Sequence, residues 1–342
     1  MTKKVTIIAE AGVNHNGDLA YAKKLIEEAS KAGADYVKFQ TFKAEKLVTH
    51  IAPKAEYQKK NFKDGLSTQF NMLKNLEIPE FWYNELIDTC NKNKIKFLST
   101  GFDEESIDFL FSLGIDFFKV PSGELTNLPL LEHIAKKGKP VVISTGMAEL
   151  NEIRSAVDLF IQNGISKNNL TVLHCNTDYP TKMIDVNLLA MSHIEKEIGL
   201  KVGYSDHTLG CEVPIAAVAL GATIIEKHFT LDKNLEGPDH KASLNPSELT
   251  YMIKMIRNLE QALSGSGIKE PSVSEYKNII IARKSIHIKN DLPKGKIITR
   301  DDLIMKRPGD GISPMNINKV IGKTTSKILM MDDKLKLEDL LK

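Results

Sequence analysis

Two histidines, His207 in GYSDHT and His228 in IEKHFT, end neighbouring apolar runs of the kind that form buried strands. If these runs are adjacent parallel strands, both imidazoles lie at the same edge of the sheet, where they can bind one metal ion. A metal ion held by two imidazoles keeps open positions for water and substrate and can act as a Lewis acid. The alternative interpretation is a pair of core histidines that hydrogen-bond within the protein.

Two lysines, Lys38 in VKFQ and Lys119 in FKVPSGE, lie near the ends of runs that otherwise exclude charge. A buried ammonium group is costly unless it has a partner, so we expect each lysine to face an anion. Phosphate or carboxylate is suitable, because ammonium groups bind such oxygens as point charges. Two alternatives remain open: a lysine that forms a Schiff base with a carbonyl substrate, or a lysine that extends its ammonium group into solvent.

Polar residues also end nearly every other apolar run in the first two thirds of the chain. Packing or capping explains any one of them, but it does not explain why so many occur at the same place in each run. The candidates are Glu10, Asn14, His15, Lys38, Gln40, Thr100, Lys119, Ser122, Glu124, Ser144, Thr145, Thr177, Tyr179, Ser205, Asp206, His207 and His228. Asp239 and His240, in EGPDH, are candidates for contacts with a metal ligand or a substrate.

Eight apolar runs position these residues, and most are followed by a stretch with helical spacing. The runs are VTIIAEAG (5–12), YVKFQTF (36–42), IKFLSTGF (95–102), FFKVPSGE (117–124), PVVISTGM (140–147), LTVLHCNT (170–177), KVGYSDHT (201–208) and TIIEKHFT (223–230). Eight such units predict a closed (β/α)8 TIM barrel, an α/β fold whose active site lies at the carboxyl ends of the strands. The first turn, EAGVNHNGD, lacks GxGxxG, which argues against a dinucleotide-binding fold.

Two further stretches divide the chain. Residues 43–65 form a long polar insertion, which we interpret as a substrate-covering loop, with a disordered excursion as the alternative. SGSGIKEPSVSE (264–275) has the composition of a linker and, fully extended, would span up to ~40 Å at ~3.3 Å per residue. We therefore predict a catalytic barrel over 1–265, a linker over 266–283 and a small β-rich domain over 284–342.

Composition excludes several classes of protein. The 342 residues carry 46 Lys and Arg against 44 Asp and Glu, so the net charge of +2 is too small for a nucleic-acid-binding face. No apolar run approaches the ~18 residues of a membrane span, and no signal peptide is recognised, so we expect a cytoplasmic protein. Cys90, Cys175 and Cys211 are far apart and are expected to be reduced packing residues.

Several long motifs, in fixed order, resemble those of the sialic acid synthases, the bacterial nonulosonate synthases. They are IAEAGVNHNG, VKFQTFKAEKL, VPSGELTNLPLL, STGMA, HCNTDYPT, GYSDHT, IEKHFTLDKN, GPDHKAS, RKSI and KRPGDGISP. The resemblance covers essentially the whole chain. It implies a (β/α)8 barrel joined to a small antifreeze-like (SAF) domain, in a domain-swapped homodimer.

The resemblance also implies roles for individual residues. His207 and His228 resemble the family's metal ligands, for which manganese is expected and magnesium or cobalt are alternatives, and Glu10 resembles a carboxylate near metal and sugar. The residues similar to the phosphoenolpyruvate cradle are Lys38, Thr100, Lys119, Ser122 and Ser205. The residues similar to sugar contacts are Gln40, Glu124, Tyr179, Asp239 and the partner's Arg307. Two further candidates for substrate binding are Thr177 and Asp206.

Three departures from the family pattern accompany these assignments. STGF stands where STPF is more usual, so the backbone beside Thr100 is expected to be looser. YPTK stands where YPTP is more usual, which places Lys182 beside the expected pocket. Thr177 stands where some relatives have Asn, which weakens its expected contact with phosphate.

The expected activity is a carbon–carbon bond-forming transfer from phosphoenolpyruvate, as in N-acetylneuraminate synthase with N-acetylmannosamine as acceptor. The alternative is legionaminate synthase, with 2,4-diacetamido-2,4,6-trideoxymannose as acceptor, and the GYSDHT and GPDHKAS motifs suit it well. Two different classes remain as competing hypotheses. One is a Schiff-base aldolase without metal, and the other is a non-catalytic ice- or sugar-binding module, which the charged C-terminal segment disfavours.

Overall fold

The structure, a computed structural model, describes residues 4–61 and 68–341. The chain divides into two compact units, Met1–Ser264 and Gly265–Lys342. Each unit has its own apolar core. They are described separately below.

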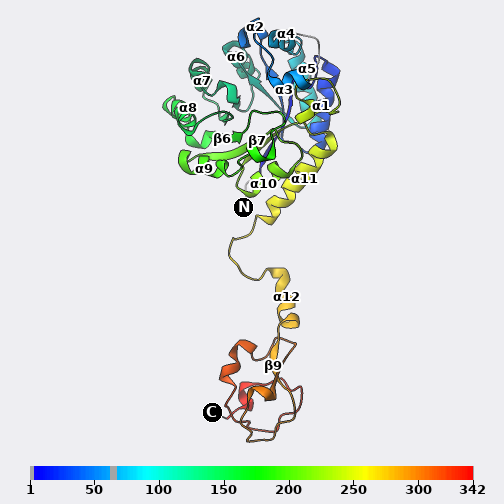
Figure 1. The fold of residues 1–342 in the computed structure, drawn as a ribbon, viewed down its shortest axis with the longest axis vertical. Coiled ribbons are helices and arrows are strands. Elements are labelled where there is room, and N and C mark those ends of the chain that lie inside the picture. The colour runs from blue at the N-terminus through cyan, green and yellow to red at the C-terminus, as the bar shows by residue number, and fades with distance from the viewer. Residues whose placement is uncertain (1–3, 62–67, 342) are drawn as a thin grey trace. The chain divides into compact units, whose positions relative to one another are not determined.

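The first unit is a barrel of eight parallel strands (Figure 1). The strands are β1 (Thr6–Gly12), β2 (Tyr36–Thr41), β3 (Lys96–Gly101), β4 (Phe118–Val120), β5 (Val141–Ser144), β6 (Leu170–Cys175), β7 (Lys201–Asp206) and β8 (Ile224–His228). Their order is β3-β2-β1-β8-β7-β6-β5-β4, and β3 also contacts β4, so that the barrel nearly closes. The sequence prediction of a TIM-like barrel is therefore confirmed.

Helices surround the strands (Figure 1). The principal ones are α1 (Leu19–Ala32), α5 (Trp82–Asn93), α6 (Glu104–Ser112), α7 (Leu128–Ala135), α8 (Leu150–Gln162), α9 (Ala190–Ile198), α10 (Glu212–Ala219) and α11 (Pro246–Ala262). Helix α1 is representative: the Asp18 side chain accepts from the backbone at its start, and Gly33, with φ 89°, ends it in the left-handed region. It buries Leu25 and Ile26 against the sheet.

The insertion between β2 and α5 folds into short helices. They are α2 (Ala44–Leu47), α3 (Glu56–Asn61) and α4 (Gln69–Lys74). A small second apolar cluster, which includes Phe42, Ala44, Met72 and Leu73, packs α2 and α4 together beside the barrel. Residues 62–65 of the predicted substrate-covering loop lie outside the described residues.

The second unit is small and has little regular structure. It contains α12 (Val273–Ala282) and the antiparallel pair β9 (Ser285–Ile288) and β10 (Leu303–Lys306). Helix α12 lies inside the stretch 266–283 that was predicted as a linker. The Ser272 hydroxyl and the Glu275 carboxylate form a capping box at the start of α12, a local signal that the linker composition obscured.

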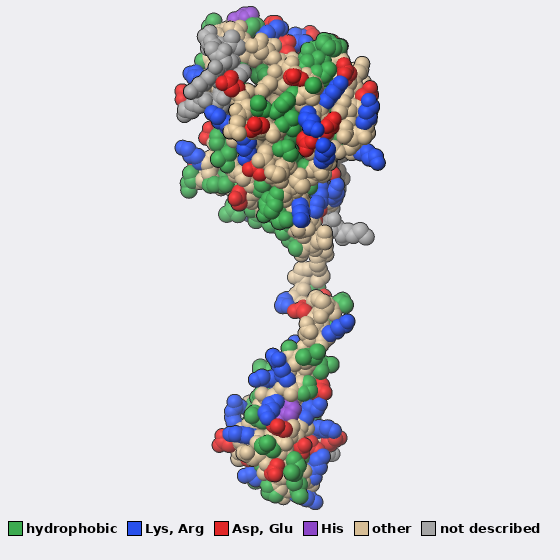
Figure 2. Space-filling model, turned by 90° about the vertical axis from the view of Figure 1, so that its right-hand side faces the viewer, with side chains coloured by type: hydrophobic (Ala, Val, Ile, Leu, Met, Phe, Trp, Pro, Cys, Tyr) green, Lys and Arg blue, Asp and Glu red, His purple; other side chains and the backbone are tan. Residues whose placement is uncertain are grey.

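Short 3₁₀ helices complete the chain. They are η1 (Ser122–Glu124), η2 (Lys167–Asn169), η3 (Met183–Asp185), η4 (His240–Ala242), η5 (Arg300–Asp302), η6 (Pro314–Lys319) and η7 (Leu337–Asp339). No helix among the described residues is long and apolar enough to span a membrane. On the face drawn in Figure 2, lysine and arginine side chains are interspersed with aspartate and glutamate, as the small net charge predicts.

Candidate active site

A cavity of about 370 Å³ lies at the carboxyl ends of the barrel strands. Most of the residues singled out by the motifs line it: Glu10, Lys38, Gln40, Thr100, Lys119, Ser122, Glu124, Thr177, Tyr179, Ser205, His207 and His228. Asp206, Asp239 and Arg307 are not among its lining residues. The barrel thus brings together side chains that are far apart in the sequence.

Strand register sets the depth of the central groups. Glu10 on β1 is level with Lys38 on β2 and with His228 on β8. Ser205 on β7 is level with Glu226 on β8. Because neighbouring parallel strands hold these residues at the same height, their side chains converge on the barrel axis rather than lining a long channel.

A buried charge cluster occupies the bottom of the cavity. Lys38 Nζ lies 2.7 Å from Glu10 Oε2, 3.7 Å from Glu226 Oε2 and 2.9 Å from Thr100 Oγ1, to which it donates. Lys119 Nζ lies 3.4 Å from Glu226 Oε1, which also accepts from Ser205 Oγ at 2.9 Å. Both lysines therefore face carboxylates, as the cost of burying an unpaired charge requires.

Burial and ion pairing shift the pKa values of this cluster in opposite directions. Burial lowers the pKa of Lys119, and the nearby Glu226 only partly offsets the fall. Burial by itself would raise the pKa of Glu226, but Lys119 and Lys38 outweigh it and hold that pKa below its usual range. Burial raises the pKa of Glu10 although Lys38 opposes the rise. A carboxylate with a raised pKa is the better proton acceptor of the two.

Glu226 is the main residue of the site that sequence reasoning missed. It lies within IIEKHFT, where Glu226 and Lys227 are the two charged residues of a buried strand. The argument that identified Lys38 and Lys119, charge within an otherwise apolar run, applies to Glu226 equally. The signal was therefore present in the sequence.

The two histidines lie side by side, with ring centroids 5.5 Å apart. His207 Nδ1 donates to the carbonyl oxygen of Asn176, which leaves Nε2 as the unprotonated nitrogen of the neutral ring. Burial lowers the pKa of His207 to about 4 and that of His228 well below its usual value, so both rings are neutral at pH 7. The Tyr179 ring lies 4.1 Å from His207 between centroids.

These histidines fit a metal ion better than a satisfied core pair. His228 Nδ1 is buried without a hydrogen-bond partner, and its nearest carboxylate oxygen, Asp239 Oδ2, is 3.9 Å away. Neutral imidazoles are the protonation state that metal ligation needs. Within residues 4–61 and 68–341, no group of three or more His, Cys, Asp or Glu side chains is arranged around a metal position. A metal held here would therefore keep most of its positions for water and substrate.

Hydroxyl groups surround the other side of the cavity. Ser122 Oγ accepts from the Gly146 backbone N–H at 2.9 Å and lies 3.1 Å from Cys175 Sγ. A Cβ on Gly146 would lie 2.8 Å from both Ser122 Oγ and Thr177 Oγ1, so only glycine fits at this point. Ser144, a strand-end candidate, also lines the cavity, and its Oγ is buried with no hydrogen-bond partner.

Asp206 has a different position from the one expected of a substrate contact. Both of its carboxylate oxygens accept from Thr208 Oγ1, and Oδ2 also accepts from Lys227 Nζ at 2.5 Å. Asp206 and Lys227 are fully buried, opposite each other on β7 and β8. The carboxylate is thus engaged within the barrel wall, and in the sequence Asp206 directly precedes His207 as Lys227 precedes His228.

Asp239 is held close to the cavity by a network that joins two loops. Ser243 Oγ donates to the Asp239 carbonyl oxygen at 2.7 Å, and Asn14 Nδ2 donates to Ser243 Oγ at 2.9 Å. Burial, together with the Glu10 charge, raises the pKa of Asp239 to about 7. Asn14 therefore supports the β8 loop that carries Asp239, a use for this strand-end candidate that sequence alone did not show.

Two further basic candidates, Lys182 and Arg307, are exposed. Arg307 belongs to the second unit, where its Nε donates to the Ala282 carbonyl oxygen at 3.0 Å and the side chain is exposed. Lys182, expected beside the pocket, is exposed and is not among the cavity-lining residues.

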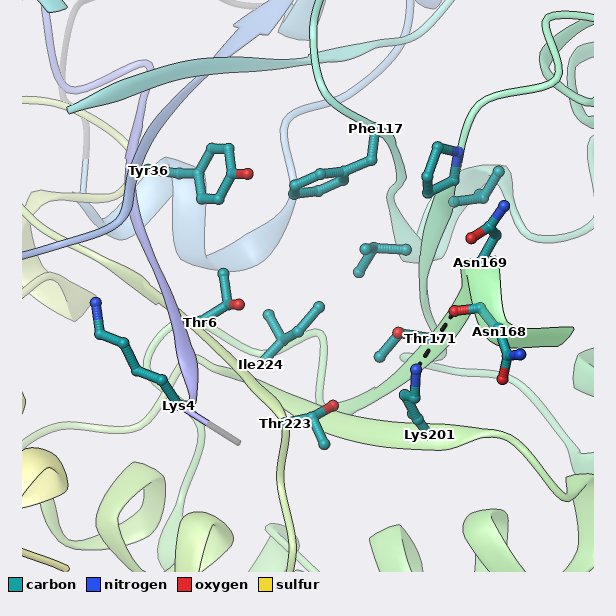
Figure 3. Close-up of a pocket in the computed structure, with 13 residues that line it drawn as sticks. Lys4, Thr6, Tyr36, Phe117, Asn168, Asn169, Thr171, Lys201, Thr223 and Ile224 are labelled. Carbon is teal, nitrogen blue, oxygen red and sulfur yellow. Dashed lines mark hydrogen bonds between the residues drawn. The ribbon is translucent and has the colours of Figure 1, made fainter. Parts of the chain in front are cut away.

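A second cavity of about 340 Å³ lies at the opposite, amino-terminal end of the barrel strands (Figure 3). Lys4, Tyr36, Phe117, Asn168 and Lys201 line it. Lys201 Nζ donates to the Asn168 carbonyl oxygen, and the Tyr36 and Phe117 rings meet edge to face. This cavity contains none of the residues that the motifs identified.

Comparison with known proteins places the chain in a family. It matches the model of the NeuB family over residues 25–269 and that of the SAF domain over residues 283–340. The N,N'-diacetyllegionaminic acid synthase of Campylobacter jejuni is 51% identical, over 97% of this chain and 98% of its own. The synthase of the same name from Legionella pneumophila is also 51% identical, over 94% and 90%.

Other relatives are more distant. The human N-acetylneuraminate-9-phosphate synthase is 37% identical, over 96% of this chain and 90% of its own. Among solved structures, the N-acetylneuraminic acid (sialic acid) synthetase of Leptospira borgpetersenii, in complex with citrate, is 34% identical with a TM-score of 0.70. The match covers 81% of this chain and 91% of that chain.

These matches confirm the family and fold class predicted from the motifs, and the prediction of a carbon–carbon bond-forming transferase among the nonulosonate synthases. They reverse the order of the two expected activities, because the relatives named for legionaminic acid are more similar than the one named for N-acetylneuraminate 9-phosphate. They also favour a synthase over a Schiff-base aldolase or an ice-binding module. The chain belongs to the NeuB family of synthases and carries a C-terminal SAF domain.

Proposed function

We propose that this protein is an N,N'-diacetyllegionaminic acid synthase. It condenses phosphoenolpyruvate with 2,4-diacetamido-2,4,6-trideoxymannose to give a nine-carbon 2-keto sugar acid and phosphate. The observation that carries the proposal is the 51% identity, across nearly the whole chain, to two synthases of that name. The main expectation from the motifs, N-acetylmannosamine as acceptor, becomes the alternative.

Lys38 and Lys119 bind phosphoenolpyruvate in this proposal. Their ammonium groups are the two lysine charges that line the cavity, and they would hold the carboxylate and phosphate of the substrate. Thr100, Ser122 and Ser205 add hydroxyl donors around them, and Thr177 lies beside Ser122. The ion pairs with Glu10 and Glu226 keep both lysines in place before the substrate arrives.

His207 and His228 would hold a divalent metal ion, for which we propose manganese, with magnesium or cobalt as alternatives. The metal would polarise the C1 aldehyde of the open-chain sugar as a Lewis acid. The two imidazoles support this proposal because both are buried and neutral. One of them, His228, has a buried nitrogen without a hydrogen-bond partner.

The bond changes balance with one molecule of water, which supplies the new oxygen on C2 and the proton that the aldehyde oxygen takes up; the C2 hydroxyl gives its proton to phosphate as the C2–O bond breaks. The C3 carbon of phosphoenolpyruvate attacks the aldehyde carbon, and the aldehyde oxygen becomes a hydroxyl group. Water adds to the cationic C2, giving a tetrahedral intermediate whose C2–O bond to phosphate then breaks. Glu10 is positioned to accept the proton of the attacking water, because it lies on the cavity floor beside Lys38 and its pKa is raised by burial.

The sugar occupies the outer part of the cavity. Gln40, which donates to Glu10 Oε1 at 3.2 Å, is expected to contact the sugar together with Glu124, Tyr179 and Asp239. Their hydroxyl, amide and carboxylate groups suit a polyhydroxylated acceptor. Holding both substrates in one cavity supplies the proximity part of the rate enhancement.

We also propose that the active unit is a domain-swapped homodimer, in which the partner's Arg307 contacts the sugar. Exposed apolar side chains on the loops after the barrel strands, or at the starts of the helices that follow those strands, support an interface there. They are Leu128, Met147, Met183, Ile184, Leu189 and Leu209. Single exposed apolar residues are ordinary, but a group on loops at one end of a barrel indicates a partner surface.

The test combines product analysis with an isotope label. The purified protein is incubated with manganese, the diacetamido sugar and phosphoenolpyruvate that carries ¹⁸O at the bridging position. The proposal predicts a nine-carbon keto acid by mass spectrometry, with the label in inorganic phosphate. Label retained in the sugar product would refute cleavage of the C–O bond, and the absence of the keto acid would refute the proposed activity.

A further inference from the structure

One side of the active-site cavity differs from the rest in chemistry. Its lining residues follow strands β2 and β3, and we call them the acceptor wall. They are Leu47, Val48, Gln58, Gln69, Leu73 and Phe102. None of the six carries a charge, whereas the floor of the same cavity is made of lysines and carboxylates. A ligand must therefore present an uncharged, partly apolar end to this wall.

Packing and hydrogen bonds hold the residues of the acceptor wall in place. Leu73 belongs to the small apolar cluster that packs α2 and α4 together, and Leu47, Val48 and Phe102 pack against that cluster. The Phe102 and Phe42 rings meet edge to face at 6.0 Å between centroids. The Gln69 backbone N–H donates to the Ala52 carbonyl oxygen at 2.9 Å. The apolar side of the wall is thus fixed by the core of the insertion.

Two side-chain amides are held together within this wall. Gln58 is buried, and its Oε1 accepts from the Ala55 backbone N–H at 2.9 Å and from Gln69 Nε2 at 3.4 Å. An acetamido group has one N–H donor and one carbonyl acceptor, and a primary amide side chain offers both complementary functions. The pair therefore has the chemistry to recognise an acetamido substituent.

The wall and the histidines lie on different strands of the same cavity. His207 and His228 end β7 and β8, whereas the wall residues follow β2 and β3, with β1 between the two groups. An acceptor whose aldehyde carbon lies at the histidines extends past Glu10 and Gln40 toward the wall. Its far end, carbons 4 to 6, is then the part that the wall contacts.

We propose that the acceptor wall selects the sugar, binding the 4-acetamido group through Gln69, which hydrogen-bonds to Gln58, and the 6-methyl group through Val48, Leu73 and Phe102. This inference rests on the proposed function. N-acetylmannosamine carries hydroxyl groups at both positions. It would present a hydroxyl group to Gln69 in place of the amide and would place a second hydroxyl against apolar side chains, and both changes disfavour it.

The experiment measures kcat/KM of the full-length protein for both sugars, with manganese and saturating phosphoenolpyruvate. Gln69→Leu removes one amide of the pair at a half-buried position and nearly preserves its volume. Val48→Thr places a hydroxyl group in the apolar part of the wall. Gln261→Leu, on the exposed surface of α11, is the matched control for the change of Gln to Leu.

The inference predicts that Gln69→Leu lowers kcat/KM for the diacetamido sugar by roughly 10- to 100-fold. The value for N-acetylmannosamine should change by less than about 3-fold, so the ratio between the two sugars falls. Val48→Thr should lower the ratio in the same direction, and Gln261→Leu should leave it unchanged. Circular dichroism and thermal unfolding check that each variant is folded.

The outcomes separate this inference from the proposed function. A wild-type protein that prefers the diacetamido sugar, together with folded Gln69→Leu and Val48→Thr variants that keep the wild-type ratio, would overturn the acceptor wall alone. An equal loss on both sugars would also overturn it, because it would indicate general damage to the cavity. A wild-type protein that does not use the diacetamido sugar would overturn the proposed function itself.

Discussion

At the scale of single residues, the site depends on groups kept in unusual protonation states by burial. His207 and His228 are neutral because burial lowers the pKa of each ring, and the hydrogen bond from His207 Nδ1 to a carbonyl oxygen directs its free nitrogen. Lys38 and Lys119 keep carboxylate partners although they are buried. Neutral imidazoles can bind a metal ion, and buried lysines can bind an anionic substrate, so these groups are suited to a functional site.

We predict that His207→Ala and His228→Ala each lose manganese binding and activity together. Each variant removes one of two proposed ligands, so the affinity measured by isothermal titration calorimetry should fall at least about 100-fold. His193→Ala, an exposed histidine on α9, is the control and should retain wild-type affinity. Full turnover by protein freed of metal with EDTA would contradict the assignment.

The residue types of this site could largely be predicted from the sequence, but their pairing could not. Lys38 and Lys119 were identified because charge is costly in an apolar run. That argument says that a partner exists without saying which residue it is. The closed barrel, which brings the ends of β2, β4 and β8 around one axis, identifies Glu226 as the carboxylate that both lysines face. Asp206 was likewise predicted as a substrate contact, whereas its carboxylate pairs with Lys227 in the barrel wall.

At the scale of elements, β7 and β8 are joined by one fully buried ion pair directly beside the proposed metal ligands. Asp206 precedes His207, Lys227 precedes His228, and Lys227 Nζ also donates to the Thr208 carbonyl oxygen. We propose that this pair fixes the separation of the two imidazoles. It would then act as a positioning device, because neither residue lines the cavity.

We predict that the double variant Asp206→Leu/Lys227→Met folds but binds manganese roughly 10- to 100-fold more weakly, since outer residues orient metal ligands. Lys227→Met alone should lose about 3–5 kcal/mol of stability, because it leaves a buried carboxylate without its partner. Arg257→Met, which breaks the ion pair with Asp35, is the control. A folded double variant with wild-type manganese affinity would show that the pair has no positioning role.

The eight strands of the barrel were predictable because each strand is a near-continuous apolar run. The short elements were harder. Helix α12 begins with a capping box, SVSE, inside a segment whose glycine, serine and proline content suggested only a linker. The insertion after β2 was recognised by its length, but its helices depend on packing against the barrel, which local patterns do not reveal.

At the scale of the whole molecule, we propose that the reaction uses residues from two chains. Arg307 belongs to the second unit, whereas the cavity belongs to the first. The start of α12 at Val273 leaves residues 265–272 as the extended connection, which spans at most about 28 Å at ~3.5 Å per residue. This is shorter than the ~40 Å expected when 264–275 was taken as extended, yet it still permits the second unit to meet another chain.

We predict that Arg307 acts in the partner's active site, which a complementation experiment can test. Homodimers of Lys38→Ala and of Arg307→Ala should both be nearly inactive. A mixed dimer contains one barrel with an intact Lys38 that faces an intact Arg307 of the partner subunit, so about one working site per heterodimer should reappear. Mixed dimers that remain inactive, with heterodimer formation verified by mass, would place Arg307 in its own chain's site or in none.

The identity of the acceptor sugar decides the proposed function, and a direct comparison of two sugars tests it. Purified protein is supplied with manganese and phosphoenolpyruvate, and kcat/KM is measured for 2,4-diacetamido-2,4,6-trideoxymannose and for N-acetylmannosamine by phosphate release, with products identified by mass spectrometry. We predict a preference of at least ~100-fold for the diacetamido sugar, because two substituents distinguish the acceptors. Equal or faster turnover of N-acetylmannosamine would contradict the proposal that the diacetamido sugar is the acceptor.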